Sequence, residues 1–148
     1  MPRTVLSLNA TLEEGNNFIM DRIYYLLPKE KINLKYVVGL INSKLIDFYY
    51  KTNFGTTHVA GGYLDLRGVQ INKIPIRLPT PPQEKKLVDL VNQMLSLQKK
   101  YHDPKTIGGE KERLKQQIDN IDYEIDQEVY KLYGLTHEEI KIVEGSLK

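Results

Sequence analysis

The stretch Gly61–Gln83, GGYLDLRGVQINKIPIRLPTPPQ, divides the chain into two differently patterned parts. It holds four of the seven prolines. Glycines in its first half predict turns, because glycine adopts backbone conformations that other residues avoid. Apolar side chains alternate from Ile71 to Leu78 between prolines, which predicts a short edge strand, since proline excludes a helix there. A helical pattern starts directly after Pro82.

This division predicts an α+β fold in two parts. The chain has 148 residues and a hydrophobic content of 41%, which suits one domain with an extension. We expect residues 1–82 to form a small mixed α/β lobe. We expect residues 83–148 to form a long antiparallel helical hairpin followed by a short C-terminal helix.

The expected lobe contains a strand, a helix and a polar loop. Residues 18–27 are dense in β-branched and aromatic side chains and stop at a proline, which predicts a strand. Apolar side chains at spacings of three and four predict a helix over residues 34–50. Asn42 and Ser43 lie beside its apolar face and are expected to make local hydrogen bonds. Residues 51–58 follow as a loop rich in hydrogen-bond donors.

The second part of the chain shows two apolar seams of the coiled-coil kind. The first seam predicts a helix over residues 84–101, opened by prolines at positions that a helix tolerates. Residues 103–109 interrupt the pattern, and a further helix is predicted from Glu110 to Gly134. The two seams are expected to close on each other as an antiparallel hairpin. A capping box that begins at Thr136 predicts a last short helix.

Composition narrows the classes of protein that fit. The net charge is +2, but residues 1–82 carry ten Lys or Arg against six Asp or Glu, while residues 83–148 carry eleven against thirteen. This excess favours an anionic partner for the first part, although it is smaller than that of strongly basic nucleic-acid domains. The chain has no cysteine, which excludes disulfides and thiolate metal sites. No apolar run approaches the ~20 residues of a membrane span, so we expect a cytoplasmic protein without a membrane partner.

Three groups of segments, in order along the chain, are similar to those of a known family. They are Leu40–Leu45 with Phe48–Tyr50, Lys73–Pro79 with Gln83–Glu84, and Ile121–Asp126 with Val129–Thr136. With these segments the chain resembles the TaqI-like C-terminal specificity domain over roughly residues 17–144, nearly the whole chain. It is similar, more distantly, to the target-recognition repeats of type I restriction specificity subunits, in which a compact lobe also precedes a long helix.

The resemblance implies a DNA target-recognition domain that serves an adenine-specific methyltransferase or a restriction endonuclease. In such a domain, a mixed α/β lobe places loops against the major groove and the helices set distance and orientation. The implied partners are double-stranded DNA and a methyltransferase or endonuclease domain or subunit. The resemblance also implies that the chain is not itself an enzyme.

Two polar loops supply the side chains that this function needs. Amide and forked donors read base edges, whereas cations and hydroxyls hold phosphates. We expect Arg67 and Gln70 to contact bases, and Lys51, Lys73 and Arg77 to anchor phosphates. The full set of candidate DNA-binding residues is Lys51, Thr52, Asn53, Thr56, Thr57 and His58 on the first loop, and Tyr63, Arg67, Gln70, Asn72, Lys73 and Arg77 on and after the second.

Several of these candidates have structural alternatives. Arg67 could pair with Asp65 instead of meeting a base. His58 could be a structural histidine with its hydrogen bonds satisfied. Asn53 and the threonines of the first loop could be ordinary turn residues.

Structural roles are also expected for helical aromatic and acidic residues. Tyr49 and Tyr50 fit the core and rim of their helix better than a base-stacking platform. Three scattered histidines without cysteine do not favour a zinc site. A solvated helix face, and not a metal site, is expected for the acids Asp119, Asp122, Asp126 and Glu128.

The sequence contains no recognisable catalytic motif. An amino-methyltransferase of the implied class carries an Asn-Pro-Pro-aromatic tetrapeptide and a glycine-rich loop for the methyl donor, and neither occurs here. Glu139–Lys141 has the form of the end of a metal-dependent nuclease motif, but no acidic partner lies on a preceding strand. We therefore expect no catalytic residue, cofactor or metal, with the catalytic machinery located elsewhere.

A function of a different class stays open beside DNA recognition. The helical hairpin could be a protein-interaction module that docks a partner or forms a homodimer. When the apolar seam of one helix is longer than the seam of the helix it packs against, such self-association is favoured. The two functions are compatible with each other.

Overall fold

The fold, given by a computed structural model, is described for residues 4–12, 15, 23–27, 32–55, 58–59 and 63–146. At positions 4, 5, 58, 59, 63 and 65 the description covers the backbone alone. The helices are α1 (Leu34–Ile41), α2 (Lys44–Phe54), α3 (Gly68–Ile71), α4 (Pro81–Tyr101), α5 (Gly109–Tyr133) and α6 (His137–Gly145). The strands are β1 (Thr4–Val5), β2 (His58–Val59) and β3 (Tyr63–Asp65).

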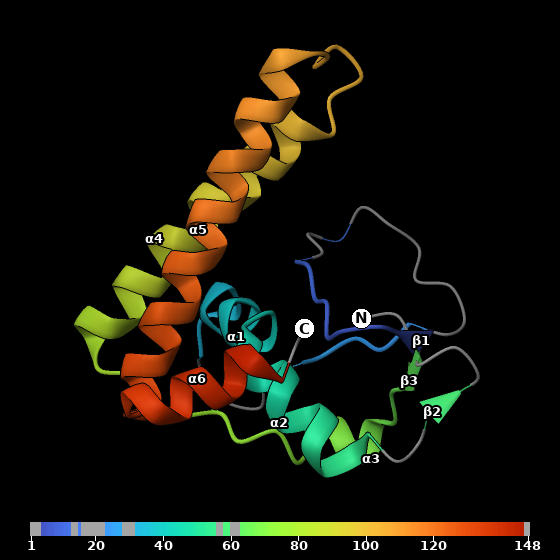
Figure 1. The fold of residues 1–148 in the computed structure, drawn as a ribbon, viewed down its shortest axis with the longest axis vertical. Helices are drawn as coiled ribbons and strands as arrows, with labels where there is room; N and C mark the ends of the chain where they lie inside the picture. The colour runs from blue at the N-terminus through green and yellow to red at the C-terminus, as the bar shows by residue number, and fades with distance from the viewer. Residues whose placement is uncertain are drawn as a thin grey trace.

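The expected α+β fold is wrong, because the described chain is mainly helical. α4 has 21 residues and α5 has 25, whereas the longest strand, β3, has three. The strands form a small antiparallel sheet in the order β1-β3-β2, with Leu64 at its centre opposite Val5 and His58. This sheet lies at one end of the molecule, away from the long helices (Figure 1). It is too small to make a layer of the fold.

The expected edge strand over Ile71–Leu78 is also wrong. α3 ends at Ile71, and residues 72–80 have no helix or strand. Ile71 and Ile74 are both buried, so the apolar period here is the three residues of a helical turn and not the two of a strand. Of the strand expected over residues 18–27, residues 18–22 lie outside the described residues, and residues 24–27 have no regular secondary structure.

The single helix expected over residues 34–50 is broken into α1 and α2. At the break, Ser43 adopts an extended backbone, with φ −75° and ψ 151°. Its hydroxyl donates to Leu40 O at 2.6 Å and accepts from Ile46 N at 3.4 Å, so it caps the first helix and starts the second. The local hydrogen bonds expected of Ser43 are confirmed, but Asn42 instead pairs with both backbone groups of Ala10.

The antiparallel hairpin is confirmed as α4 packed along α5 (Figure 1). Lys86 Nζ on α4 lies 2.7 Å from Glu128 Oε1 on α5. α5 ends at Tyr133 and is capped by Gly134, whose φ of 73° lies in the left-handed conformation that favours glycine. α6 begins at the expected capping box, in which Thr136 and Glu139 exchange hydrogen bonds. Within the described residues, no helix is long and apolar enough to cross a bilayer.

Two apolar clusters form the core, and α1 joins them. Val37 of α1 and Tyr133 of α5 pack against both clusters. The lobe and the hairpin therefore share a continuous apolar contact, while the expected division at residue 82 stays a prediction. The first cluster contains Leu8, Ala10, Ile41, Ile46, Tyr50, Leu64, Leu66, Ile71 and Ile74. The second contains Tyr36, Leu40, Leu87, Leu90, Val91, Ile125, Val129 and Leu132.

Helix α1 approaches α4 closely because a glycine faces the contact. A Cβ atom placed on Gly39 would lie 2.9 Å from Val91 Cγ2 and 3.1 Å from Leu87 Cγ. The buried Leu87 and Val91 side chains have little room to move aside. The absence of a side chain at Gly39 thus sets the distance between α1 and the hairpin.

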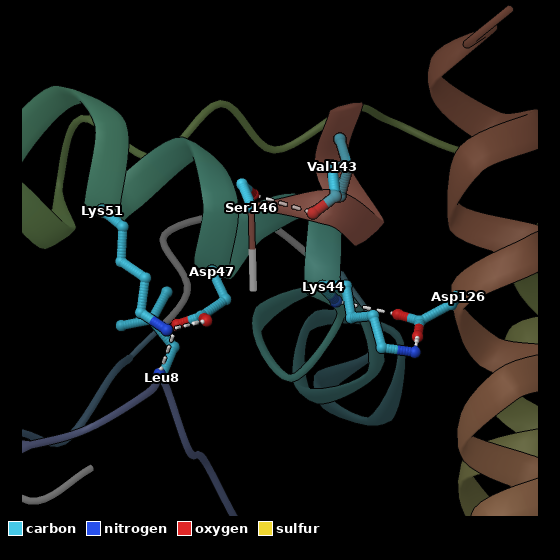
Figure 2. A network of polar contacts seen from close by, with 7 residues as sticks. All are labelled: Leu8, Lys44, Asp47, Lys51, Asp126, Val143 and Ser146. Atoms are coloured by element: carbon cyan, nitrogen blue, oxygen red, sulfur yellow. Dashed lines mark hydrogen bonds and ion pairs between the residues drawn. The ribbon is translucent and has the colours of Figure 1, made fainter. Parts of the chain in front are cut away.

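The expected solvated acidic face of α5 is wrong at Asp126. The side chain of Asp126 is 2% exposed. Its Oδ2 lies 2.7 Å from Lys44 Nζ, and its Oδ1 accepts the backbone N–H of Lys44 at 2.8 Å, at the first residue of α2 (Figure 2). A carboxylate at a helix N-terminus stabilises the helix through its unpaired N–H groups. Asp126 therefore ties the hairpin to α2.

Replacing Gly39 by alanine is expected to destabilise the fold. Alanine favours a helix over glycine by about 1 kcal/mol, but overpacking a core costs about 1–3 kcal/mol, so we expect a net loss of about 1 kcal/mol in the free energy of unfolding. Urea denaturation measures this loss. In the matched control Gly145→Ala in α6, the added Cβ meets nothing within 4 Å, and stability should not fall. Equal effects of the two substitutions would contradict the close packing of α1 on α4.

Replacing Asp126 by asparagine is expected to lower the free energy of unfolding by about 1–3 kcal/mol. The loss should fall below that of a fully buried pair, because the Lys44 side chain is 39% exposed and can turn to water. Urea denaturation again measures the change. The control Asp119→Asn alters an exposed acid on the same helix and should stay within about 0.5 kcal/mol of the wild type. A loss at position 126 no larger than the control's would show that the pair does not tie the two parts together.

Candidate nucleic-acid interface

Helix α3 is fastened to the second half of α2 by two tyrosine hydroxyls. Tyr49 Oη donates to Lys73 O at 3.2 Å, and Tyr50 Oη donates to Gln70 Oε1 at 2.9 Å. The ring of Tyr50 packs against Phe54, with 5.2 Å between ring centroids. These contacts bring the start of the first candidate loop beside the second, and α2 and α3 lie side by side at the lower edge of the molecule (Figure 1).

Two more tyrosines hold the proline-containing segment after α3. Tyr133 Oη donates to Pro75 O at 2.6 Å and accepts the Arg77 N–H at 3.2 Å, while Tyr36 Oη donates to Arg77 O at 2.6 Å. Burial raises the pKa of both Tyr36 and Tyr133, so their hydroxyls remain protonated donors at neutral pH. The backbone around Arg77 is thereby fixed by side chains from α1 and α5.

The candidates of the second loop lie on or just after this fixed backbone. Arg67 occupies the residue before α3, and its side chain is exposed. Gln70 is half-buried and bonded to Tyr50, whereas Asn72, Lys73 and Arg77 are exposed. Within the described part of the chain, neither Lys73 nor Arg77 forms an ion pair. Their positive charges are thus available to an anionic ligand.

Three candidates of the first loop belong to α2 instead, because the helix continues to Phe54. Lys51 Nζ lies 2.7 Å from Asp47 Oδ2, and Asp47 Oδ1 accepts the backbone N–H of Leu8 at 2.8 Å (Figure 2). Lys51 therefore helps to hold the N-terminal segment on α2. Asn53 donates from Nδ2 to Tyr49 O, and Thr52 is exposed.

The side chains of the remaining candidate DNA-binding residues lie outside the described part of the structure. Thr56 and Thr57 lie outside the described residues, as do the side chains of His58 on β2, Tyr63 on β3 and Asp65. The possible pairing of Arg67 with Asp65 and the structural role suggested for His58 stay open. For these residues the assignment to DNA contact remains a prediction.

The sequence did not point to the tyrosines as positioning residues. Tyr50 is fully buried and Tyr49 half-buried, which confirms their expected places in the core and at the rim of the helix. Their hydrogen bonds to residues 70 and 73 were not anticipated. One signal was present: Tyr36 and Tyr133 lie on apolar helix faces, and a buried tyrosine hydroxyl usually finds a partner. Nothing in the pattern showed that the partner would be the segment after α3.

Titratable groups elsewhere serve the fold. Burial raises the pKa of Asp126, and the ammonium and backbone N–H of Lys44 oppose that rise. The backbone N–H of Thr136 lowers the pKa of Glu139, because this carboxylate caps α6. Glu139 is therefore a capping residue. Among the described residues, no group of three His, Cys, Asp or Glu side chains is placed to hold a metal ion.

Comparison with known proteins identifies the family of the chain. Searches among curated proteins and among solved structures found no match. A family model described as the TaqI-like C-terminal specificity domain matches residues 1–76, just over half of the chain. The matched range includes the sheet, α1, α2 and α3, and it links them to DNA target recognition in a restriction-modification context. The matched range ends at residue 76, so the expected extension of the resemblance to residue 144 stays a prediction. The family expected from the sequence is confirmed, and the chain belongs to the family of TaqI-like C-terminal specificity domains.

Proposed function

We propose that the chain recognises a specific sequence in double-stranded DNA on behalf of a separate adenine-specific methyltransferase or restriction endonuclease. In this proposal the chain carries no catalytic site of its own and binds no cofactor. It selects the place on the duplex at which a partner domain or subunit in the cytoplasm acts. Its own contribution to the reaction is binding energy and orientation.

One observation carries this proposal: exposed polar side chains project from a backbone that buried side chains hold in place. The backbone in question runs from the end of α3 to Pro75. Ile71 and Ile74 anchor it in the core, and the hydroxyls of Tyr49 and Tyr133 donate hydrogen bonds to its carbonyl groups. Direct reading of bases depends on side chains placed within a fraction of an ångström, which a fixed turn supplies and a mobile loop does not. A polar surface that served solubility alone would not need this support.

The candidate residues divide into two roles under this proposal. Arg67 and Asn72, at the two ends of α3, suit base edges because forked and amide groups form paired hydrogen bonds with guanine or adenine. In this proposal Gln70 has both a structural and a binding role. Its hydrogen bond with Tyr50 positions α3, and its side chain faces the duplex. Lys73 and Arg77 suit phosphates, since each is exposed and lacks an ion pair within the described residues.

The helices would set the distance between the recognition surface and the partner. The apolar seams of α4 and α5 pack against each other within one chain, with Leu90 and Ile125 both buried. A homodimer through these helices stays a prediction. Assembly with a methyltransferase or endonuclease is the partner role that we propose for the hairpin.

The proposal predicts that the full chain selects one DNA motif from a pool of duplexes with randomised centres. Repeated binding and recovery should enrich that motif. Fluorescence titration should then show binding about 10³-fold tighter than to a scrambled duplex at physiological salt, because base contacts persist where phosphate contacts weaken.

The scrambled duplex has the same length and base composition, so it controls for charge. A single-stranded pool provides the second control and should yield no motif. The proposed function fails if no motif is enriched or if the two duplexes bind with equal affinity.

The phosphate role of Lys73 and Arg77 predicts a change in salt dependence. Replacing both by alanine should reduce the slope of log K against log salt concentration by about 1.8, because each phosphate contact contributes ~0.9. Affinity for target and scrambled duplexes should fall by the same factor. Lys141→Ala on α6, an exposed lysine without an ion pair among the described residues, is the control and should leave the slope unchanged. A slope equal to that of the wild type would show that Lys73 and Arg77 do not contact phosphates.

A further inference from the structure

The far end of the hairpin is basic, although the hairpin as a whole is acidic. We define the hairpin tip as residues 99–115, which carry six Lys or Arg against three Asp or Glu. The remaining residues of the two helices, 81–98 and 116–133, carry three Lys or Arg against seven Asp or Glu. Charge therefore changes sign between the tip and the base of the same pair of helices.

The cations of the tip are exposed and unpaired within the described residues. They are Lys99, Lys100, Lys105, Lys111, Arg113 and Lys115, and all are exposed. The ion pairs of the described chain lie elsewhere, on Lys44, Lys51, Lys86 and Lys131. Lys111 makes the one other charged contact described for this set, with its Nζ 5.0 Å from the centre of the Tyr101 ring. Such a contact keeps the positive charge.

The acids of the tip are engaged by the backbone or lie at a helix start. Asp103 Oδ1 accepts the Lys105 N–H at 2.9 Å. Glu110 and Glu112 lie in the first turn of α5, where the helix dipole favours negative charge. The acids thus serve the local fold, and the neighbouring lysines retain a net positive field.

The tip is also an ordered platform. Thr106 Oγ1 donates to Lys100 O at 2.8 Å, and Thr106 N donates to Asp103 O at 2.9 Å. Leu114 is buried at 7% exposure, so the two helices remain packed close to their connection. Long side chains on a fixed turn lose less entropy on binding than side chains on a mobile loop.

The length of the hairpin suits a second contact on the same duplex. Helix α4, with 21 residues, spans about 31 Å at ~1.5 Å per residue. One turn of B-DNA repeats after about 34 Å. The hairpin extends away from the lobe, with its tip far from α2 and α3 (Figure 1). Phosphates one turn away from the recognised bases are therefore within the range that the hairpin can span.

We propose that the hairpin tip binds the phosphate backbone of the duplex about one helical turn from the site that the α2–α3 surface recognises. This inference rests on the proposed function and adds a second, sequence-independent contact to it. The tip supplies affinity and orientation, while the acidic base of the hairpin is repelled by the duplex and stays turned away from it. The alternative ligand for the hairpin tip, in place of DNA phosphates, is an acidic protein surface.

The test compares two double variants with the same loss of charge. Lys105→Ala with Lys115→Ala alters the tip, and Lys85→Ala with Lys141→Ala alters exposed lysines outside it. The probes are the selected duplex and its scrambled form, titrated at several salt concentrations. We expect the tip variant to lower affinity for both duplexes by the same factor and to reduce the salt slope by about 1.8, with the ratio of the two affinities unchanged.

Trimming the duplex gives a second measurement. When the flank on one side ends within about half a turn, ~5 base pairs, of the motif, wild type and tip variant should bind equally, because the tip has no phosphates to meet. Trimming the other flank should leave their difference intact.

The outcomes separate the inference from the proposed function. Binding of the tip variant equal to that of the charge-matched control overturns the inference, and an acidic protein surface then becomes the expected occupant. A tip effect that persists on the trimmed duplexes also overturns it. If the wild type prefers no motif but the tip variant still lowers the salt slope, the proposed function fails while the phosphate contact of the tip is supported.

Discussion

The carboxylate of Asp126 is the constraint that joins the two parts of this molecule. It lies on the hairpin and receives both the ammonium and the backbone N–H of Lys44, where α2 starts. A buried carboxylate requires such partners, because leaving it alone in an apolar core would cost several kcal/mol. The pair therefore fixes one end of α2 against α5. Since α2 carries Tyr49 and Tyr50, the orientation of α3 relative to the hairpin follows from it.

In this fold, side-chain hydrogen bonds supply partners for the backbone of the non-helical segments, as strand pairing does in a sheet. The extended N-terminal segment is held by Asp47 at Leu8 and by Asn42 at Ala10, and the segment after α3 is held by tyrosine hydroxyls. Backbone groups that no strand pairs still need partners when water is excluded. This explains how a chain with a sheet of very short strands keeps non-helical segments ordered beside its helices.

The same contacts fix the position of the proposed recognition surface. The family match covers the part of the chain that contains α2 and α3, and it ends before the hairpin begins. Polar side chains at the ends of α3 are carried by a turn that is fastened from two sides. The hairpin is basic at its tip and acidic towards its base, and this difference underlies the proposed phosphate contact of the tip.

Local sequence patterns by themselves determined α4, α5 and α6, because a helix is specified by its own apolar period and by caps such as Thr136 and Gly134. Around Lys73 and Arg77 the same patterns predicted an edge strand that is absent, although both side chains are exposed. Tertiary structure decided the burial of Asp126, the place of Asn42 and the position of α3, because their partners are remote in sequence: Lys44 meets Asp126 across 82 positions, Asn42 meets Ala10 across 32, and Tyr50 meets Gln70 across 20. The break at Ser43 and the ion pair of Lys51 with Asp47 use partners only three and four residues away, but the apolar period does not report them either. A periodic pattern cannot report such pairs, because it records which face of an element is apolar and not which group will satisfy a polar atom on it.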